Sequence, residues 1–202
     1  MLALQSKSLK TELYRKAIHL SSLWMPLLIL STNRNVCIIL FSSLLCINVI
    51  FEYAAFQKFP LIGSWFRRLF IKTLRTKEVD HTKFVASGSV YILAAALIVS
   101  VCFSAKAAAV AMAVMLISDS SAALIGKFFG TVRFANGKSV EGTLAFFLSS
   151  VCVLYCADIS PFMIMLTALV STAAEFFEKD IGIDDNFSIP IATAFILNLL
   201  SI

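Results

Sequence analysis

Apolar stretches separated by clusters of charged residues run along the whole chain. Seven of these stretches approach the length of about 17 to 25 residues that a helix needs to cross roughly 30 Å of hydrocarbon. They are Ala17–Ser31, Val36–Phe51, Phe84–Phe103, Ala107–Ile125, Leu144–Ala157, Phe162–Phe177 and Ile189–Ile202. Several are shorter than an ideal span, so we expect their helices to extend into the polar flanks. The pattern predicts an all-α integral membrane protein, a bundle of about seven transmembrane helices.

One further segment has a different pattern. From Leu61 to Arg75, apolar residues recur at helical spacing, while Arg67, Arg68 and Lys72 fall on the other side. This predicts one amphipathic helix lying in the membrane interface. We expect it to anchor the chain, and it could also guide a lipid towards a site.

The composition supports a membrane location. The 202 residues are 59% hydrophobic and only 14% charged, with a mean hydropathy of +0.90. Soluble domains are about half apolar and about a quarter charged. Residues 1–202 are therefore interpreted as a single membrane-embedded domain. The polar segment Met1–Lys16 and the apolar run after it lack a small-residue cleavage site, which predicts a retained first helix rather than a signal peptide.

The cysteines carry no recognisable metal or disulfide pattern. All five lie inside apolar runs, without a CxxC pair, at Cys37, Cys46, Cys102, Cys152 and Cys156. We interpret them as small buried hydrophobic residues.

Charged residues sort strongly between the two faces that seven crossings define. The N-terminus and the loops 52–83, 126–141 and 178–188 share one face. That face holds all of the 17 Lys and Arg residues except Arg34 and Lys106, and all of the 12 acidic residues except Asp158. The positive-inside rule makes it the cytoplasmic face, in a bacterial plasma membrane or the endoplasmic reticulum. The net charge of +5 then reflects topology and attraction to anionic membrane lipids, and nothing indicates a nucleic-acid partner.

Asp119 is the most informative charge inside an apolar run, where ionised groups are costly. It lies about six residues, or roughly 9 Å, inside the cytoplasmic end of its span. Helical spacing places Asp119, Ala123 and Lys127 on one face. Asp119 could pair with Lys127 to hold the bundle together, or it could bind a metal or substrate. We favour the second interpretation because of the neighbouring glycine-rich segment.

That segment holds four of the chain's seven glycines, Gly126, Gly130, Gly137 and Gly142, interspersed with Lys127, Arg133, Lys138, Ser139 and Glu141. Backbone N–H groups at glycines and lysine side chains suit a polyphosphate. Gly137-Lys138-Ser139 resembles the end of a Walker A loop, but Val132 stands where the first glycine should be. Alternatively, Gly126 and Gly130 could serve close helix packing.

A third cluster contains acids. Glu175 lies near the end of an apolar helix, and Asp184, Asp185 and Asn186 precede the last span. Carboxylate and amide oxygens next to phosphate are what Mg²⁺ prefers. One of the three residues before the span could instead cap the following helix. The intervening residues are interpreted as solvated turn residues: Glu178, Lys179 and Asp180.

Arg15 and His19 are four residues apart and share a helical face, with Glu12 one turn earlier. An Arg on this face could clamp a phosphate, although a lone interfacial His is commonly structural. Acids, glycines and lysines beside a membrane are the components that phosphoryl transfer needs. The residues themselves predict a nucleotide- or phosphate-using lipid enzyme.

At these same residues the chain resembles the polyprenol, phytol and diacylglycerol kinases typified by dolichol kinase. The matching motifs are Arg15-Lys16 with His19, Glu78, Ser118–Gly130, Gly137–Thr143, Glu175 and Asp184–Pro190. Members of that family are integral membrane enzymes that phosphorylate a lipid alcohol, several of them with CTP in place of ATP. The resemblance implies a lipid-alcohol substrate such as a polyprenol, a phytol-like isoprenoid or diacylglycerol, CTP or ATP as donor, and Mg²⁺ or another divalent cation.

The resemblance also implies roles for individual residues. The catalytic candidates are Asp119, Glu175, Asp185 and Lys138. The metal candidates are Asp119, Glu141, Glu175, Asp185 and Asn186. The nucleotide-binding candidates are Gly126, Lys127, Gly130, Gly137, Lys138, Ser139, Gly142, Arg15 and His19. Two departures from the family pattern are Ser118, where a glycine or another small residue often stands, and the lack of an Arg near Glu52.

Two other functions are compatible with parts of this pattern. A cytidylyltransferase would join the nucleotide to a lipid phosphate with release of pyrophosphate. A transporter would place ionisable groups near the midplane or at both mouths, whereas this sequence places nearly all of them at one.

Overall fold

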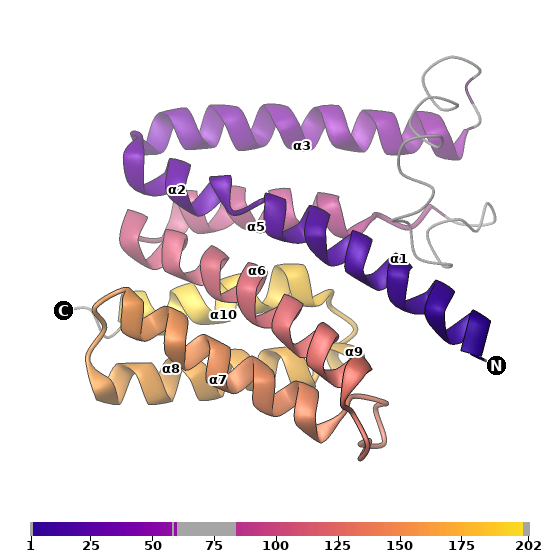
Figure 1. Cartoon of the computed structure of the whole chain (residues 1–202). Helices are drawn as coiled ribbons and strands as arrows, with labels where there is room; N and C mark the ends of the chain where they lie inside the picture. Colours follow the sequence, from indigo (N-terminus) through magenta and orange to yellow (C-terminus); the bar gives the residue numbers. More distant parts are fainter. Residues whose placement is uncertain (1, 58, 60–83, 200–202) are drawn as a thin grey trace.

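The computed structural model describes residues 2–57, 59 and 84–199, and its regular elements in these ranges are helices (Figure 1). They are α1 (Leu2–Ser21), α2 (Trp24–Ser31), α3 (Arg34–Phe56), α5 (Gly88–Cys102), α6 (Ala105–Phe128), α7 (Val140–Cys156), α8 (Pro161–Phe176), α9 (Glu178–Ile181) and α10 (Asp185–Leu199). The predicted all-α class is confirmed. The predicted amphipathic helix 61–75 lies outside the described residues, as does Glu78.

Two helices of the described part are long and apolar enough to cross a membrane. They are α3, with 23 residues, and α6, with 24. Three further apolar helices are shorter, with 15 residues in α5, 17 in α7 and 16 in α8. The two long helices support association with a membrane, and the count of seven spans stays a prediction.

The first predicted span, Ala17–Ser31, is wrong as a single helix. Helix α1 ends at Ser21, and α2 begins at Trp24. The cause is Pro26, which has no N–H to donate to the Ser22 carbonyl and whose ring would clash with it in a continuous helix. In the first turn of a new helix the missing N–H costs nothing. Helix α1 consequently extends back over the polar N-terminal segment.

Helix α6 forms the centre of the bundle. It contacts α1, α2, α5, α7 and α10. Its first half is rich in buried alanines, which allow neighbouring helices to approach closely. The largest fully buried side chains include Met112, Met115 and Leu116 on α6 and Phe146 and Leu154 on α7. Asp119 is therefore carried by the most enclosed helix of the described fold.

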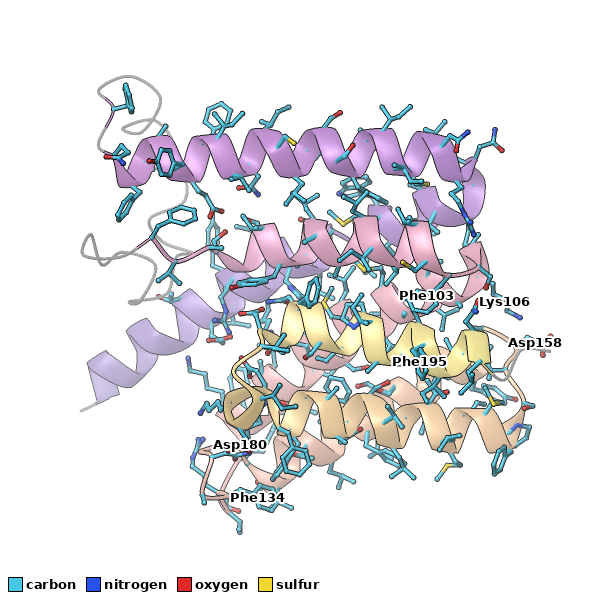
Figure 2. All side chains as sticks on the ribbon, turned by 180° about the vertical axis from the view of Figure 1, so that it is seen from behind. Phe103, Lys106, Phe134, Asp158, Asp180 and Phe195 are labelled. Carbon is cyan, nitrogen blue, oxygen red and sulfur yellow. The ribbon has the colours of Figure 1, made fainter. Side chains whose placement is uncertain are left out.

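The connections gather at two opposite ends of the bundle. The segments 129–139 and 177–184 lie at the end where the chain begins, and the turns near 33, 103 and 158 lie at the other end (Figure 1). Figure 2 shows Phe134 and Asp180 at one end and Lys106 and Asp158 at the other. The described loops therefore lie at the two ends to which the order of the apolar runs assigns them. Which end faces the cytoplasm stays a prediction.

The interpretation of the cysteines is wrong for four of the five. Cys37 is buried, but Cys46, Cys102, Cys152 and Cys156 are exposed, and all are free thiols. The reason is that these helices are apolar on every side. A small apolar residue in such a helix can therefore lie on the outer surface of the bundle as readily as in its core.

Packing around Phe146 generates a first expectation. Its side chain is 0% exposed, whereas Leu148 on the same helix is 53% exposed. We expect Phe146→Ala to lower the free energy of unfolding by about 3 to 5 kcal/mol because it leaves a cavity at the α6–α7 contact. Leu148→Ala is the matched control and should cost little. Thermal unfolding of the detergent-purified protein measures both, and equal losses would contradict the expectation.

Candidate functional site

A cavity of about 510 Å³ opens at the end of the bundle where α1, α6, α7 and α8 meet the 129–139 loop. Its lining includes much of the predicted site: Arg15, Asp119, Gly126, Lys127, Gly137, Lys138, Ser139, Gly142, Glu175 and Asp185. It also includes residues without a predicted role, among them Glu12, Thr143, Glu178 and Lys179. The predicted residues outside this lining are His19, Gly130, Glu141 and Asn186. The fold thus brings three separate sequence clusters to one cavity.

Asp119 is held by helix α1. The Lys16 Nζ atom lies 2.5 Å from Asp119 Oδ2, and His19 Nε2 lies 3.4 Å from the same oxygen. Lys16 is 5% exposed and His19 is 8% exposed. The alternative in which Asp119 pairs with Lys127 is wrong, because Lys127 Nζ instead lies 3.6 Å from Glu12 Oε2. His19 contacts Asp119 rather than the cavity.

Lys16 is a site residue to which the sequence assigned no role. It lies three residues before His19, so both side chains leave α1 on the same face, towards α6. The spacing of Lys16 and His19 can be seen in the sequence. The partner of Lys16 cannot, because Asp119 is 103 residues away along the chain.

Three glycines of the glycine-rich segment serve helix packing. A Cβ at Gly126 would lie 2.7 Å from Ser139 Oγ, and a Cβ at Gly142 would lie 3.0 Å from the Ala122 carbonyl oxygen. A Cβ at Gly130 would collide with the Gly126 carbonyl oxygen. The packing alternative given for Gly126 and Gly130 is therefore confirmed. Gly142, which was not part of that alternative, takes part in the same close approach between the end of α6 and the start of α7.

Gly137 has a different role, because its φ of +84° is one that side chains rarely adopt. The turn at Gly137 leads into Lys138, whose Nζ lies 2.6 Å from Glu175 Oε1 and 3.4 Å from Glu178 Oε2. Lys138 also donates to the Glu175 carbonyl oxygen. Ser139 caps α7, its Oγ accepting from the Gly142 N–H at 3.0 Å. Lys138 therefore lies among carboxylates in this structure.

The loop before Lys138 is tied to the end of α8. Asn136 donates from Nδ2 to the Phe176 carbonyl oxygen at 2.9 Å. Lys179 in turn donates to the Asn136 carbonyl oxygen at 2.5 Å. Arg133 donates to the Gly137 carbonyl oxygen at 3.0 Å. These contacts hold the 129–139 loop beside Glu175 and Glu178.

Glu141 lies at the start of α7, before the predicted span. Its Oε1 accepts hydrogen bonds from the Thr131 hydroxyl and, at 2.8 Å, from the Thr131 N–H. These bonds stabilise the ionised form and lower the pKa of Glu141 to about 2. The structure does not bring Glu141 together with Glu175 and Asp185 in the cavity lining. Its observed role is to fasten the loop to α7.

The acids at the α8–α10 wall form a tight group. One carboxylate oxygen from each of Glu178, Asp184 and Asp185 lies within 4.8 Å of the others. The interpretation of Glu178 as a solvated turn residue is wrong, because it faces Lys138 and lines the cavity. Its three-residue spacing from Glu175 could have indicated this. The cap alternative holds for Asp184, whose Oδ1 accepts from the Asn186 N–H at 3.1 Å.

One buried carboxylate, that of Glu52, received no role from the sequence. Glu52 on α3 is 6% exposed and accepts hydrogen bonds from the Ser87 hydroxyl and, at 3.0 Å, from the Ser87 N–H. Ser87 directly precedes α5. Next to it, a Cβ at Gly88 would lie 3.4 Å from Asn186 Nδ2. Glu52 thereby fixes the start of α5 against α3, and Gly88 leaves room for the start of α10 beside it.

Comparisons with known proteins reveal two relatives. The chain is 28% identical over 187 residues to the uncharacterized protein RP860 of Rickettsia prowazekii, a match covering 90% of each chain. It is 40% identical over 97 residues to the uncharacterized protein MJ1137 of Methanocaldococcus jannaschii, covering 46% of this chain and 48% of that protein. No protein-family model matches the chain. No solved structure matches it either.

The Lys16–Asp119 pair generates the second expectation. Lys16→Met should lower the free energy of unfolding by about 3 to 5 kcal/mol, because it leaves a buried carboxylate without its positive partner. The double variant Lys16→Met/Asp119→Leu should recover most of that loss. Arg15→Met is the neighbouring control: its side chain is 32% exposed beside Glu12, and its loss should stay below about 1 kcal/mol. Additive losses in the double variant would show that the pair does not stabilise the fold.

Proposed function

We propose that this chain is a membrane enzyme that transfers the terminal phosphate of CTP or ATP to the hydroxyl of a lipid alcohol. One observation carries the proposal. One cavity at an end of the apolar bundle brings cationic side chains and a glycine-rich loop together with buried carboxylates. Phosphoryl transfer needs both, the first for the phosphates and the second for a metal and a proton.

The outer part of the cavity suits a nucleotide. Lys127, Lys138 and Lys179 line it, together with Arg15 and Arg133. These side chains can neutralise the charge of a triphosphate. Lys138 lies in the 129–139 loop and lines the cavity beside Glu175, so its ammonium group could contact the phosphate that is transferred.

The inner part suits the acceptor alcohol. Asp119 lies nine residues before the end of α6, which is roughly 13 Å along the helix. Both of its basic neighbours contact Oδ2. We assign Asp119 as the proton acceptor. The alcohol oxygen forms a bond to the terminal phosphorus as the bond to the bridging oxygen breaks, and its proton passes to the carboxylate. The products are a lipid phosphate and a nucleoside diphosphate.

A bound divalent cation such as Mg²⁺ would neutralise the transferred phosphoryl group. The α8–α10 wall has suitable ligand chemistry, because Glu175, Asp185 and Asn186 offer hard oxygen atoms. The buried Glu175 Oε2 and Asn186 Oδ1 atoms have no hydrogen-bond partner within the described residues, which supports this fit. Lys138 would keep Glu175 oriented through its contact with Oε1.

The proposed topology gives the third expectation. In a variant whose native cysteines are replaced by alanine, Lys179→Cys should react with a membrane-impermeant thiol reagent only from the cytoplasmic side. Lys106→Cys, at the opposite end of the bundle, should react only from the other side (Figure 2). Labelling of intact cells and of inverted vesicles distinguishes the two. Reaction of both cysteines from one side would contradict the proposed orientation.

The kinase activity itself gives the fourth expectation. Purified full chain in detergent with Mg²⁺ and γ-labelled CTP or ATP should transfer label to a polyprenol, phytol or diacylglycerol. Asp119→Asn and Lys138→Met should each reduce the rate by about 100-fold or more, because they remove the proton acceptor and a phosphate contact.

Asp158→Asn is the matched control for that assay. Asp158 lies at the opposite end, and its φ of +55° is one that asparagine tolerates well. It should retain the full rate. The absence of labelled lipid with every alcohol and both nucleotides would refute the kinase. Label entering the lipid from α-labelled CTP, with pyrophosphate released, would indicate a cytidylyltransferase instead.

A further inference from the structure

The carboxylates around the cavity fall into two groups with different partners. On the α1–α6 wall, Asp119 is bound by Lys16 and His19. On the α8–α10 wall, Glu178, Asp184 and Asp185 bring one oxygen each to within 4.8 Å of one another. Such a spacing lets three oxygens contact a single ion at the distances of about 2.0 to 2.6 Å typical of Mg²⁺ and Ca²⁺.

The backbone brings these three acids together through a tight turn. Helix α9 ends at Ile181, and Gly182 follows in the left-handed conformation, with a φ of +74°. The reversal carries the chain from Glu178 back to Asp184 within a few residues. Asp184 then caps α10, so its carboxylate is fixed against the Asn186 amide, with 2.6 Å between Oδ1 and Nδ2.

A second, independent observation concerns two buried oxygens beside this group. Glu175 is 7% exposed and lines the same cavity as Glu178 and Asp185, yet its Oε2 has no hydrogen-bond partner within the described residues. Asn186 is 5% exposed, and its Oδ1 is likewise unpartnered. A buried acceptor without a donor is costly, and a cation would satisfy it.

The distribution of positive charge favours the same wall. Glu175 and Glu178 share one ammonium group, that of Lys138. Asp119, by contrast, has Lys16 at 2.5 Å as a buried partner of its own. A divalent cation gains less from a carboxylate that is already neutralised than from two that share a single positive charge.

We propose that Glu178, Asp184 and Asp185 bind one divalent cation of the Mg²⁺ or Mn²⁺ type, and that Asp119 is not one of its ligands. Glu175 Oε2 and Asn186 Oδ1 complete the oxygen environment. The proposal deepens the function proposed above, because it separates a cation-binding wall from the wall that receives the alcohol. It adds Glu178, which the sequence analysis interpreted as a turn residue, and it gives Asp184 a ligand role in addition to its observed cap.

The test measures Mn²⁺ binding to the detergent-purified full chain by electron paramagnetic resonance, without nucleotide or lipid. The wild type should bind Mn²⁺, and excess Mg²⁺ should displace it. Glu178→Gln and Asp185→Asn should each weaken binding at least tenfold. Asp119→Asn should leave it within about twofold of the wild type. Asp180→Asn is the matched control, an exposed acid on the same short helix as Glu178, and should bind as the wild type does.

Thermal unfolding accompanies each titration, and binding is compared only between folded variants. If Glu178→Gln unfolds early, it is replaced by Glu178→Asp, which keeps the charge but withdraws the oxygen. If Asp119→Asn unfolds early, it is replaced by the double variant Lys16→Met/Asp119→Leu, which removes both charges of the buried pair. Absence of Mn²⁺ binding in the wild type, unchanged binding in Glu178→Gln, or loss of binding in Asp119→Asn would each overturn the proposal. The readout requires no phosphoryl transfer. Mn²⁺ binding with the expected variant pattern in a protein without kinase activity would therefore support this site and refute the proposed function alone.

Discussion

An ionised carboxylate inside an apolar helix bundle is stable only beside a positive group, and this constraint organises the described fold. Asp119 lies on α6, the helix that most others contact, and its positive partner Lys16 comes from α1. The pair therefore determines where the polar N-terminal helix docks. It also places Glu12 and Arg15, one turn before and directly beside Lys16, at the cavity.

A second contact shapes the end of α6 where the cavity opens. The glycines at 126 and 142 let the end of α6 and the start of α7 approach each other, and Ser139 caps α7 at that contact. Close helix packing and the proposed phosphate loop thus use the same short segment. The packing role accounts for Gly126, Gly130 and Gly142, while Gly137 and Lys138 remain at the cavity surface.

The cavity consequently has two walls with different chemistry. Asp119 on the α6 wall lies deeper in the bundle and has its own cationic partner. The α8–α10 wall lies nearer the loops and holds several carboxylates around Lys138. This separation suits a reaction between a lipid group and a soluble phosphate donor. In the proposed reaction, the lipid would approach along the apolar helices and the donor would enter from the loop end.

The sequence by itself determined the helical class, most helix positions and the grouping of the described loops, because apolar runs and their periodicity are local properties of the chain. It also singled out Asp119, Lys138, Glu175 and Asp185, which the fold brings to one cavity. It did not identify the partner of Asp119 or the involvement of Glu178, and it misjudged the first span and the exposure of four cysteines. These features depend on which helix faces lie together. Only the tertiary structure decided that, because a charge pair between residues 103 positions apart leaves no periodic trace in the sequence.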